Sequence, residues 1–329
     1  MLEVNTSQRR VDNRGFRRMF NPGRLTLGVM FPIEAFEHDR PTMRRQVLLA
    51  QRADEGGFGA LWFRDVPLRD PNFGDIGQVF DPWVYLGFIS AQTREIALAT
   101  GSIVLPIRHP IHTAKAAASV DQLSQGRLVL GVASGDRPVE FPAFGRNLET
   151  RGDVFREHLG MFHRLLAETF PQIENSYGSL HGVDLVPKPV ADGIPVLVTG
   201  NSRQSLEWIA QHSDGWITYP RSPEAQRRVI HGWQATAELH RPGEFLPFAQ
   251  SLYIDLDSNP DRRPQPIHFG WRVGRTWLVD ILAGLQSAGA NHVALNLKYG
   301  QRPADEVLEE LIEYVVPCFS RNELVPETA

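Results

Sequence analysis

The sequence contains one cysteine, Cys318. An intramolecular disulfide is therefore impossible, and no cysteine or histidine residues have the spacing of zinc ligands. The sequence has no run of about 18 apolar residues, and its basic N-terminal stretch is not followed by the apolar segment of a signal peptide. We therefore expect a cytoplasmic protein without a membrane span.

A surplus of basic charge is also absent. The 34 lysine and arginine residues are outnumbered by 38 acidic residues, and the net charge is −4. Because the basic residues are dispersed along the chain, nothing favours binding to nucleic-acid phosphates. The 42% hydrophobic residues, 28 glycines and 24 prolines instead indicate a globular chain with many turns.

Short apolar runs alternate with longer segments of helical periodicity from Leu25 onward. This pattern is typical of parallel strands joined by helices, which is the α/β class. Because about eight strands are expected, we predict a single closed (β/α)₈ TIM barrel. The strands are expected near residues 25, 60, 96, 127, 194, 215, 248 and 292, and helices over residues 41–55, 82–92, 111–123, 151–168 and 202–212.

The expected domain organisation is an N-terminal arm (1–22), a barrel (23–320) and a C-terminal tail (321–329). The arm is either solvated or ordered on the barrel or a partner subunit. Residues 177–187 look like a small hairpin, and residues 257–275 form an irregular insertion at the C-terminal rim. A doubly wound sheet is the alternative fold, but its glycine-rich fingerprint is missing after the first strand.

Ligands of a closed barrel meet the loops that follow the strands, so polar residues at strand ends are the candidate site. In the segment from Thr199 to Ser205, a strand passes through Gly200 and Asn201 toward a helix start. Backbone N–H groups and the hydroxyls of Ser202 and Ser205 could hold a cofactor phosphate there. The alternative is that Ser202 only caps the helix.

Two further strand ends carry small residues. Ser134 stands at the end of the fourth strand, in a turn that lets the backbone approach a planar ligand. Thr100, Gly101 and Ser102 follow the third strand, where a flat ring could lie. A β-bulge is the other interpretation of these three residues.

Charged residues also follow strands. Asp65 comes after Arg64 at the end of the second strand and could bond a ring nitrogen or substrate, or form a surface ion pair. Arg108 and His109 could face an anionic ligand, or His109 could begin the next helix. Arg272 could bind an anion or be solvated.

Aromatic side chains could form an apolar wall of the site. Any of them could equally fill the barrel core, which is the more frequent fate of aromatic residues in such strands. The candidates are Phe31, Trp62, Phe63 and Trp271.

The stretch ATGSIVLPIRHPIHTAKAAASVDQLSQGRLVLGVASGDRPVEFPAFG, ending at Gly145, resembles the central part of the bacterial-luciferase-like flavin monooxygenases. A second stretch, from Pro195 to Gly215, is similar to the flavin-phosphate segment of that family. With GFGALWFRD and DPWVYLGFISAQT, the resemblance covers residues 25–218 and extends more loosely to Leu297.

The resemblance implies a bound FMN. Its phosphate would lie on Gly200, Asn201, Ser202 and Ser205, with Ser134 beside the ribityl or phosphate end. Its ring would lie against Thr100, Gly101 and Ser102. Phe31 and Asp65 are further cofactor-binding candidates. The family often has a non-proline cis peptide at this place, so we predict one at Gly101-Ser102.

Two departures from luciferase are evident. Asp65 stands where luciferase has a catalytic histidine, and Ala133-Ser134 stand where it has a reactive cysteine and an arginine. Light emission is therefore not expected.

The activity implied is oxidation of a small organic substrate by O₂ and reduced FMN, which a separate reductase or NAD(P)H supplies. Asp65, Arg108 and Arg272 are the catalytic candidates. A deazaflavin-dependent dehydrogenase of the same superfamily and a non-catalytic flavin-binding barrel are the alternatives. A homodimer is expected from the resemblance alone.

Overall fold

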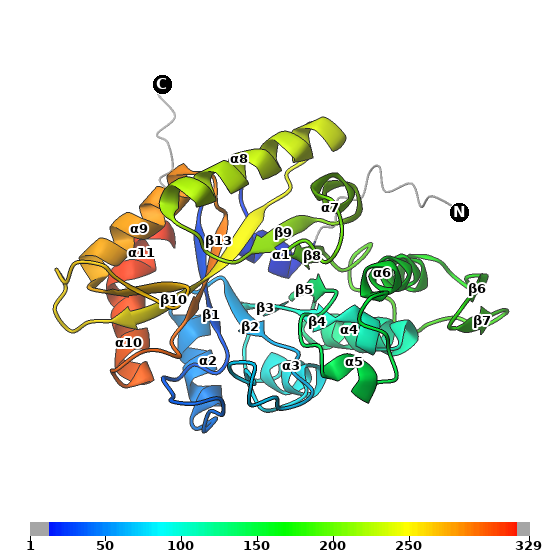
Figure 1. Cartoon of the computed structure of the whole chain (residues 1–329), viewed down its shortest axis with the longest axis horizontal. Helices are drawn as coiled ribbons and strands as arrows, with labels where there is room; N and C mark the ends of the chain where they lie inside the picture. Colours follow the sequence, from blue (N-terminus) through cyan, green and yellow to red (C-terminus); the bar gives the residue numbers. More distant parts are fainter. Residues whose placement is uncertain (1–12, 321–329) are drawn as a thin grey trace.

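The computed structural model describes residues 13–320 and shows a closed barrel of eight parallel strands (Figure 1). The strand order is β1-β2-β3-β5-β8-β9-β10-β13, and β13 pairs with β1 to close the ring. The predicted class and all eight strand positions are therefore confirmed. The strands are β1 (Thr26–Met30), β2 (Ala60–Phe63), β3 (Ala97–Thr100), β5 (Leu128–Ala133), β8 (Val196–Thr199), β9 (Gly215–Thr218), β10 (Phe248–Leu256) and β13 (His292–Asn296).

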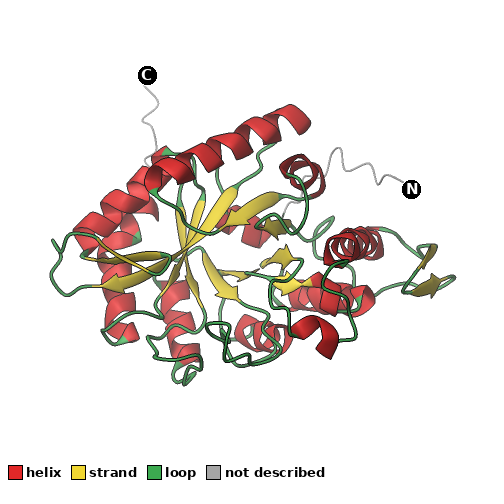
Figure 2. Cartoon of the chain, in the orientation of Figure 1, coloured by secondary structure: helices red, strands yellow, loops and turns green. Residues whose placement is uncertain are grey.

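Helices surround the strands, as Figure 2 shows by colour. Helix α3 begins after Asp81, whose carboxylate accepts the N–H of Trp83 at 2.9 Å, and His109 caps α4. Helix α2 begins later than predicted, because Met43 and Arg45 have left-handed φ angles of 59° and 58°. The helices outside the barrel are α2 (Gln46–Glu55), α3 (Pro82–Ser90), α4 (Pro110–Leu123), α5 (Glu140–Ala143), α6 (Arg151–Ala167), α7 (Leu206–His212), α8 (Pro223–His240), α9 (Arg275–Ser287), α10 (Ala304–Glu310) and α11 (Pro317–Ser320).

Alternation along the strands separates two cores. Along β1, Leu27 and Val29 pack outward in the large layer shared with the helices, whereas Met30 faces into the barrel. The inward positions carry mainly small side chains, because an eight-stranded barrel has little interior volume. They include Ala60, Ala97, Ala99, Val129, Leu197, Ile217, Ala249 and Ala294.

Helix α1 (Arg14–Met19) closes the N-terminal end of the barrel. Met19 and Phe20 are buried in the inner core, where Thr26 Oγ1 donates to the Met19 carbonyl at 2.5 Å. The arm is predicted to be either solvated or ordered on the barrel or a partner subunit. Residues 13–20 are ordered on the barrel. Residues 1–12 and the predicted tail, 321–329, lie outside the described residues.

The same end of the barrel contains the buried His292. Trp62 Nε1 donates to His292 Nε2 at 2.9 Å, so the ring proton lies on Nδ1, 2.6 Å from Thr26 Oγ1. Burial lowers the pKa of His292 to about 3. The imidazole is therefore a neutral structural link between three segments.

Two hairpins leave the barrel. The first, β6 (Ile173–Asn175) with β7 (Gly178–Leu180), projects beyond α6 and begins earlier in the chain than predicted (Figure 1). The second corrects the prediction of an irregular insertion: β11 (Gln265–Ile267) pairs with β12 (Gly270–Val273), and β12 extends the sheet beside β10. Within residues 13–320, no helix is long and apolar enough to cross a membrane.

Candidate functional site

The predicted ring segment lies at the C-terminal mouth of the barrel. The Gly101-Ser102 peptide is cis, as predicted. A Cβ on Gly101 would lie 3.1 Å from the Trp62 ring, so the glycine leaves the space above this ring open. The Ser102 hydroxyl hydrogen-bonds the Thr199 hydroxyl at the end of β8. Residues 97 positions apart in sequence are thereby joined at one rim.

The predicted phosphate segment follows Thr199 directly. Gly200, Ser202 and Arg203 have φ angles of 55°, 44° and 62°. Among the hydrogen bonds of residues 13–320, the backbone N–H groups of Asn201, Ser202 and Arg203 have no acceptor. Successive free N–H groups of this kind form an anion-binding loop.

The serine residues of this segment differ in role. Ser202 Oγ donates to the Thr199 carbonyl at 2.9 Å and accepts the N–H of Ser134 at 3.2 Å. Ser205, and not Ser202, caps α7 by accepting the N–H of Trp208. The left-handed φ of Ser202 is incompatible with the expected helix start at 202, and α7 begins four residues later, at Leu206. The hydroxyl of Ser202 therefore joins the phosphate segment to Ser134.

Asp65 and Arg108 form a paired unit. Arg108 Nε and Nη2 donate to the Asp65 carboxylate at 2.7 and 2.6 Å, and the N–H of Val104 donates to it at 3.1 Å. Burial by itself would lower the pKa of the Arg108 guanidinium. The carboxylates of Asp65 and Asp81 outweigh this effect, so the pKa lies above its ordinary value. The pair ties the loop after β2 to the loop before α4.

Three residues predicted for the site lie away from the ring segment or already use their polar atoms in hydrogen bonds or ion pairs within the protein. Phe31 is fully buried on the outer face of the sheet and packs on Phe63 and Tyr85, so its side chain does not reach the mouth. Thr100 Oγ1 donates to the Gly131 carbonyl at 2.7 Å within the sheet. Arg272 Nε lies 3.3 Å from the carboxylate of Asp257, on the rim hairpin.

A buried charge cluster at the mouth was missed by the sequence analysis. Asp75, in the loop after β2, lies 2.6 Å from Arg64 Nη2 and 3.1 Å from Lys298 Nζ. Arg137 Nη2 donates to the Asp75 carbonyl at 2.6 Å. Although burial raises the pKa of Asp75, the charge of Arg64, the N–H of Gly77 and Lys298 hold it below its usual value. We refer to Arg64, Asp75, Arg137 and Lys298 as the basic cluster.

Aromatic side chains border the basic cluster. The Tyr253 ring lies 5.1 Å from the Tyr299 ring, and Tyr219 stacks on Phe269 at 5.3 Å. Burial raises the pKa of Tyr253 to about 12, so its phenol is neutral. The alternation of side chains along the strands could have indicated two members of the cluster. Trp62 and Ala294 face into the barrel, so Arg64 and Lys298, an even number of residues later, are expected on the same inner side.

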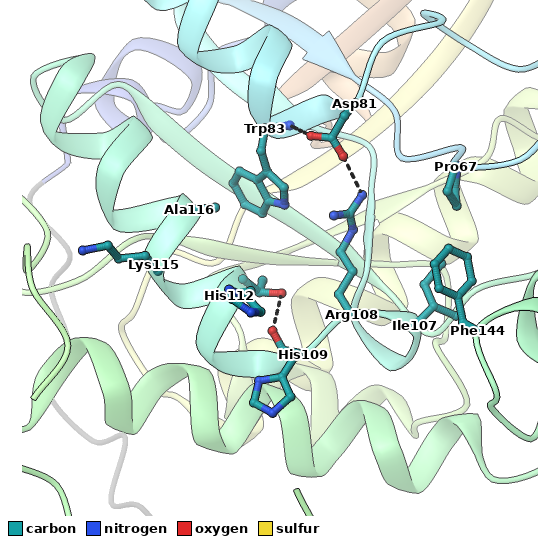
Figure 3. A pocket seen from close by; sticks show the side chains of 11 residues that line it. Pro67, Asp81, Trp83, Ile107, Arg108, His109, His112, Lys115, Ala116 and Phe144 are labelled. Carbon is teal, nitrogen blue, oxygen red and sulfur yellow. Dashed lines mark hydrogen bonds and ion pairs between the residues drawn. The ribbon is translucent and has the colours of Figure 1, made fainter. Parts of the chain in front are cut away.

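A pocket of about 570 Å³ lies beside the mouth, between the N-terminal ends of α3 and α4 (Figure 3). Its volume is within the range of small-molecule sites. Arg108 lines it and reaches Asp81 at 3.2 Å (Figure 3). None of its lining residues belongs to the ring or phosphate segments. The pocket is lined by Pro67, Asp81, Trp83, Ile107, Arg108, His109, His112, Thr113, Lys115, Ala116 and Phe144.

Within residues 13–320, no group of three or more histidine, cysteine, aspartate or glutamate side chains could hold a metal ion.

The chain belongs to the luciferase-like monooxygenase family, which it matches over residues 25–277. The family consists of flavin-dependent monooxygenases and oxidoreductases. An uncharacterized protein of Mycobacterium tuberculosis is 32% identical over 219 residues, 66% of this chain and 73% of the relative. The alkanal monooxygenase alpha chain of Photorhabdus laumondii is 27% identical over 224 residues, 66% of this chain and 60% of that protein.

Solved structures share the fold. Monooxygenase RslO1 from Streptomyces bottropensis superposes with a TM-score of 0.70 at 19% identity and covers 89% of this chain and 99% of its own. An F420-dependent secondary alcohol dehydrogenase reaches 0.73 at 18% identity, covering 91% and 100%. The oxygenating constituent of 3,6-diketocamphane monooxygenase from Pseudomonas putida, in complex with FMN, reaches 0.68 at 16% identity, covering 89% and 98%. These likenesses concern the barrel alone.

Proposed function

We propose that this protein is an FMN-dependent monooxygenase that uses reduced flavin and O₂ to oxidise a small organic substrate. The observation that carries the proposal is the contact between three segments that sequence alone assigned to the flavin. Ser102 of the ring segment bonds Thr199, and Ser202 of the phosphate segment bonds both Thr199 and Ser134. These hydrogen bonds join the three segments at the barrel mouth into the surface that we propose for the flavin.

This surface fits FMN at both ends. The flat Gly101-Ser102 peptide beside Trp62 offers a platform without side-chain bulk for the isoalloxazine ring. The free N–H groups from Asn201 to Arg203 are donors for the phosphate. Reduced FMN supplies the electrons for O₂ activation, and the protein orients the ring and limits its exposure to water.

The three charged candidates act by positioning in this proposal. Asp65 and Arg108 hold the two loops on either side of the ring segment, because Asp65 accepts the N–H of Val104 two residues after Ser102. Arg272 holds the rim hairpin against Asp255 and Asp257.

A deazaflavin-dependent dehydrogenase remains the competing function, since structures of both kinds share the fold. The discriminating experiment is a fluorescence titration of the protein with FMN and, separately, with a deazaflavin. We expect FMN to bind, and Ser202→Ala to raise its Kd about tenfold, equivalent to about 1.4 kcal/mol. Ser287→Ala, at an exposed site on α9, is the matched control.

The outcomes separate the candidates. Binding of deazaflavin without FMN would assign the dehydrogenase function, and binding of neither would contradict a flavin site. Consumption of O₂ by the FMN-loaded protein under a supply of reduced flavin separates a monooxygenase from a non-catalytic flavin-binding barrel. A flavin reductase as partner and a cytoplasmic location stay predictions.

We also propose a homodimer that is formed through α3. Phe80, Val84 and Phe88 recur at four-residue spacing, and all three are exposed, Val84 to 72%. Val84 and Phe88 lie one turn apart on α3, and Phe80 lies just before this helix, so together they form an exposed apolar patch that favours a protein contact. We expect Val84→Lys to convert a dimer to a monomer in light scattering. Leu239→Lys, at a position 75% exposed on α8, should leave the mass unchanged.

A further inference from the structure

The basic cluster holds more positive charge than its own carboxylate balances. Arg64 and Lys298 both contact Asp75, and Arg137 bonds only the carbonyl of this residue. Three cations therefore share one carboxylate, which leaves a surplus of two positive charges. Asp75, Arg137 and Lys298 are each at most 8% exposed, so bulk water screens this surplus poorly.

Other acidic groups near the cluster compensate little. Asp136, next to Arg137 in the chain, is exposed to solvent, and burial raises the pKa of Glu140, three residues after Arg137, to about 7. The neighbouring aromatic groups Tyr219, Tyr253 and Tyr299 are neutral phenols. Buried uncompensated cations cost several kcal/mol, and a single cation would be enough to hold Asp75 in place.

Two donors in the cluster are unused. Within residues 13–320, Arg64 Nε and Arg137 Nη1 are buried and have no hydrogen-bond partner. Buried polar atoms without partners are rare in native proteins, and a guanidinium donor is suited to a planar or tetrahedral oxyanion. The surplus charge and the unpaired donors therefore both favour an anionic ligand.

The position of the cluster distinguishes it from the phosphate segment. Arg64 follows β2 and Lys298 follows β13, and these strands flank β1. The phosphate segment follows β8, which lies four strands from β1 in either direction around the ring. A flavin phosphate held at β8 would therefore have Arg64 and Lys298 across the mouth, while Arg137 reaches Asp75 from the loop after β5.

We propose that the basic cluster binds an anionic group of the substrate, a carboxylate, sulfonate or phosphate, beside an aromatic wall formed by Tyr219, Tyr253 and Tyr299. This inference rests on the proposed function, because it places the substrate opposite the flavin. Lys298 and Arg64 supply the charge, and Arg137 supplies a directed donor.

The test is calorimetric titration of the FMN-loaded protein with benzoate and with benzyl alcohol, which share a ring and differ in charge. We expect benzoate to bind at least tenfold more tightly. Lys298→Met and Arg137→Gln should each weaken benzoate at least tenfold and leave benzyl alcohol unchanged. Arg227→Gln, an exposed arginine on α8, is the matched control for removal of one positive charge.

Equal affinity for the two probes, or benzoate binding that is insensitive to both variants, would overturn the proposal. If Lys298→Met fails to fold, Arg137→Gln, which removes no contact to the Asp75 carboxylate, gives the answer by itself.

A parallel titration of FMN-free protein distinguishes the two proposals. Benzoate selectivity without any FMN binding would keep the anion site and contradict the flavin function. Competition between FMN and benzoate would mean that the cluster binds the cofactor phosphate, which would overturn its assignment to the substrate.

Discussion

The two sides of the barrel mouth use different chemistry. On the side of β5 and β8, Ser134, Ser202 and the loop after Gly200 present hydroxyls and free backbone N–H groups. On the side of β13 and β2, Lys298 and Arg64 present buried side-chain charge. Backbone donors fix a ligand by geometry, whereas the surplus charge selects it by sign. Under the two proposals above, one side of the mouth would hold the cofactor and the other side would select the substrate.

The largest effect is expected at Gly131, in the wall of the side assigned to the cofactor. A Cβ at this position would lie 1.9 Å from the Thr100 carbonyl oxygen, so Gly131→Val must push β3 and β5 apart. We expect a loss of at least about 4 kcal/mol in the free energy of unfolding, measured by denaturant titration.

Gly160→Ala is the control for this substitution. A Cβ at Gly160, on α6, meets no neighbouring heavy atom within 4 Å apart from its own helix. We expect a gain of up to about 1 kcal/mol. Wild-type stability of Gly131→Val would refute the close contact between the two strands.

The second effect concerns the basic cluster. Asp75→Asn removes the carboxylate that Arg64 and Lys298 share and should cost about 3 to 5 kcal/mol. Because the folded-state pKa of Asp75 is lowered, its contribution is present above the ordinary carboxyl pKa of about 3.9 and is lost as the pH falls. The unfolding free energies of wild type and variant should therefore converge in acid.

Added sulfate should raise the Tm of Asp75→Asn more than that of the wild type, since it replaces the missing negative charge. The exposed Asp280→Asn on α9 is the control and should show neither effect. If sulfate raised the Tm of both proteins equally, the surplus positive charge of the basic cluster would be contradicted.

The smallest effect is a pH-dependent one on the side of β5. Glu140 is buried with Oε1 unpaired among residues 13–320, and burial raises its pKa to about 7. The folded state therefore keeps a proton that the unfolded state releases above pH 4.5, and stability falls as the pH rises from 4.5 to 7.

Glu140→Gln removes this penalty. We expect it to stabilise the protein by up to about 3 kcal/mol at pH 8 and by nothing at pH 4.5, measured by denaturant unfolding at both values. The exposed Glu224→Gln on α8 should show no difference between the two pH values. A gain that is equal at both would rule out titration of Glu140 as the cause.

The two sides also differ in how far the sequence predicted them. Gly101, Ser134 and Ser202 stand in short segments directly after strands, so the local pattern made them candidates and the family resemblance assigned them to the flavin; this assignment stays a prediction. Asp75 and Arg137 lie within long loops, and nothing in their neighbours along the chain indicates that they meet Lys298. The barrel itself was predicted because its strands are regular, whereas the start of α2 and the rim hairpin depend on left-handed residues and on pairing with β10.

Helix α1 limits how far the chain can be shortened from its N-terminus. It precedes the first strand, yet Met19 and Phe20 occupy the bottom of the barrel beside His292. A chain shortened to begin at Leu25, the first residue of the segment shared with the family, would keep all eight strands. It would lose the side chains of Met19 and Phe20, which close the N-terminal end of the barrel. Water would then reach an interior lined with small side chains. We therefore expect that the smallest piece able to fold includes Met19 and Phe20 and is longer than the segment 25–277 shared with the family.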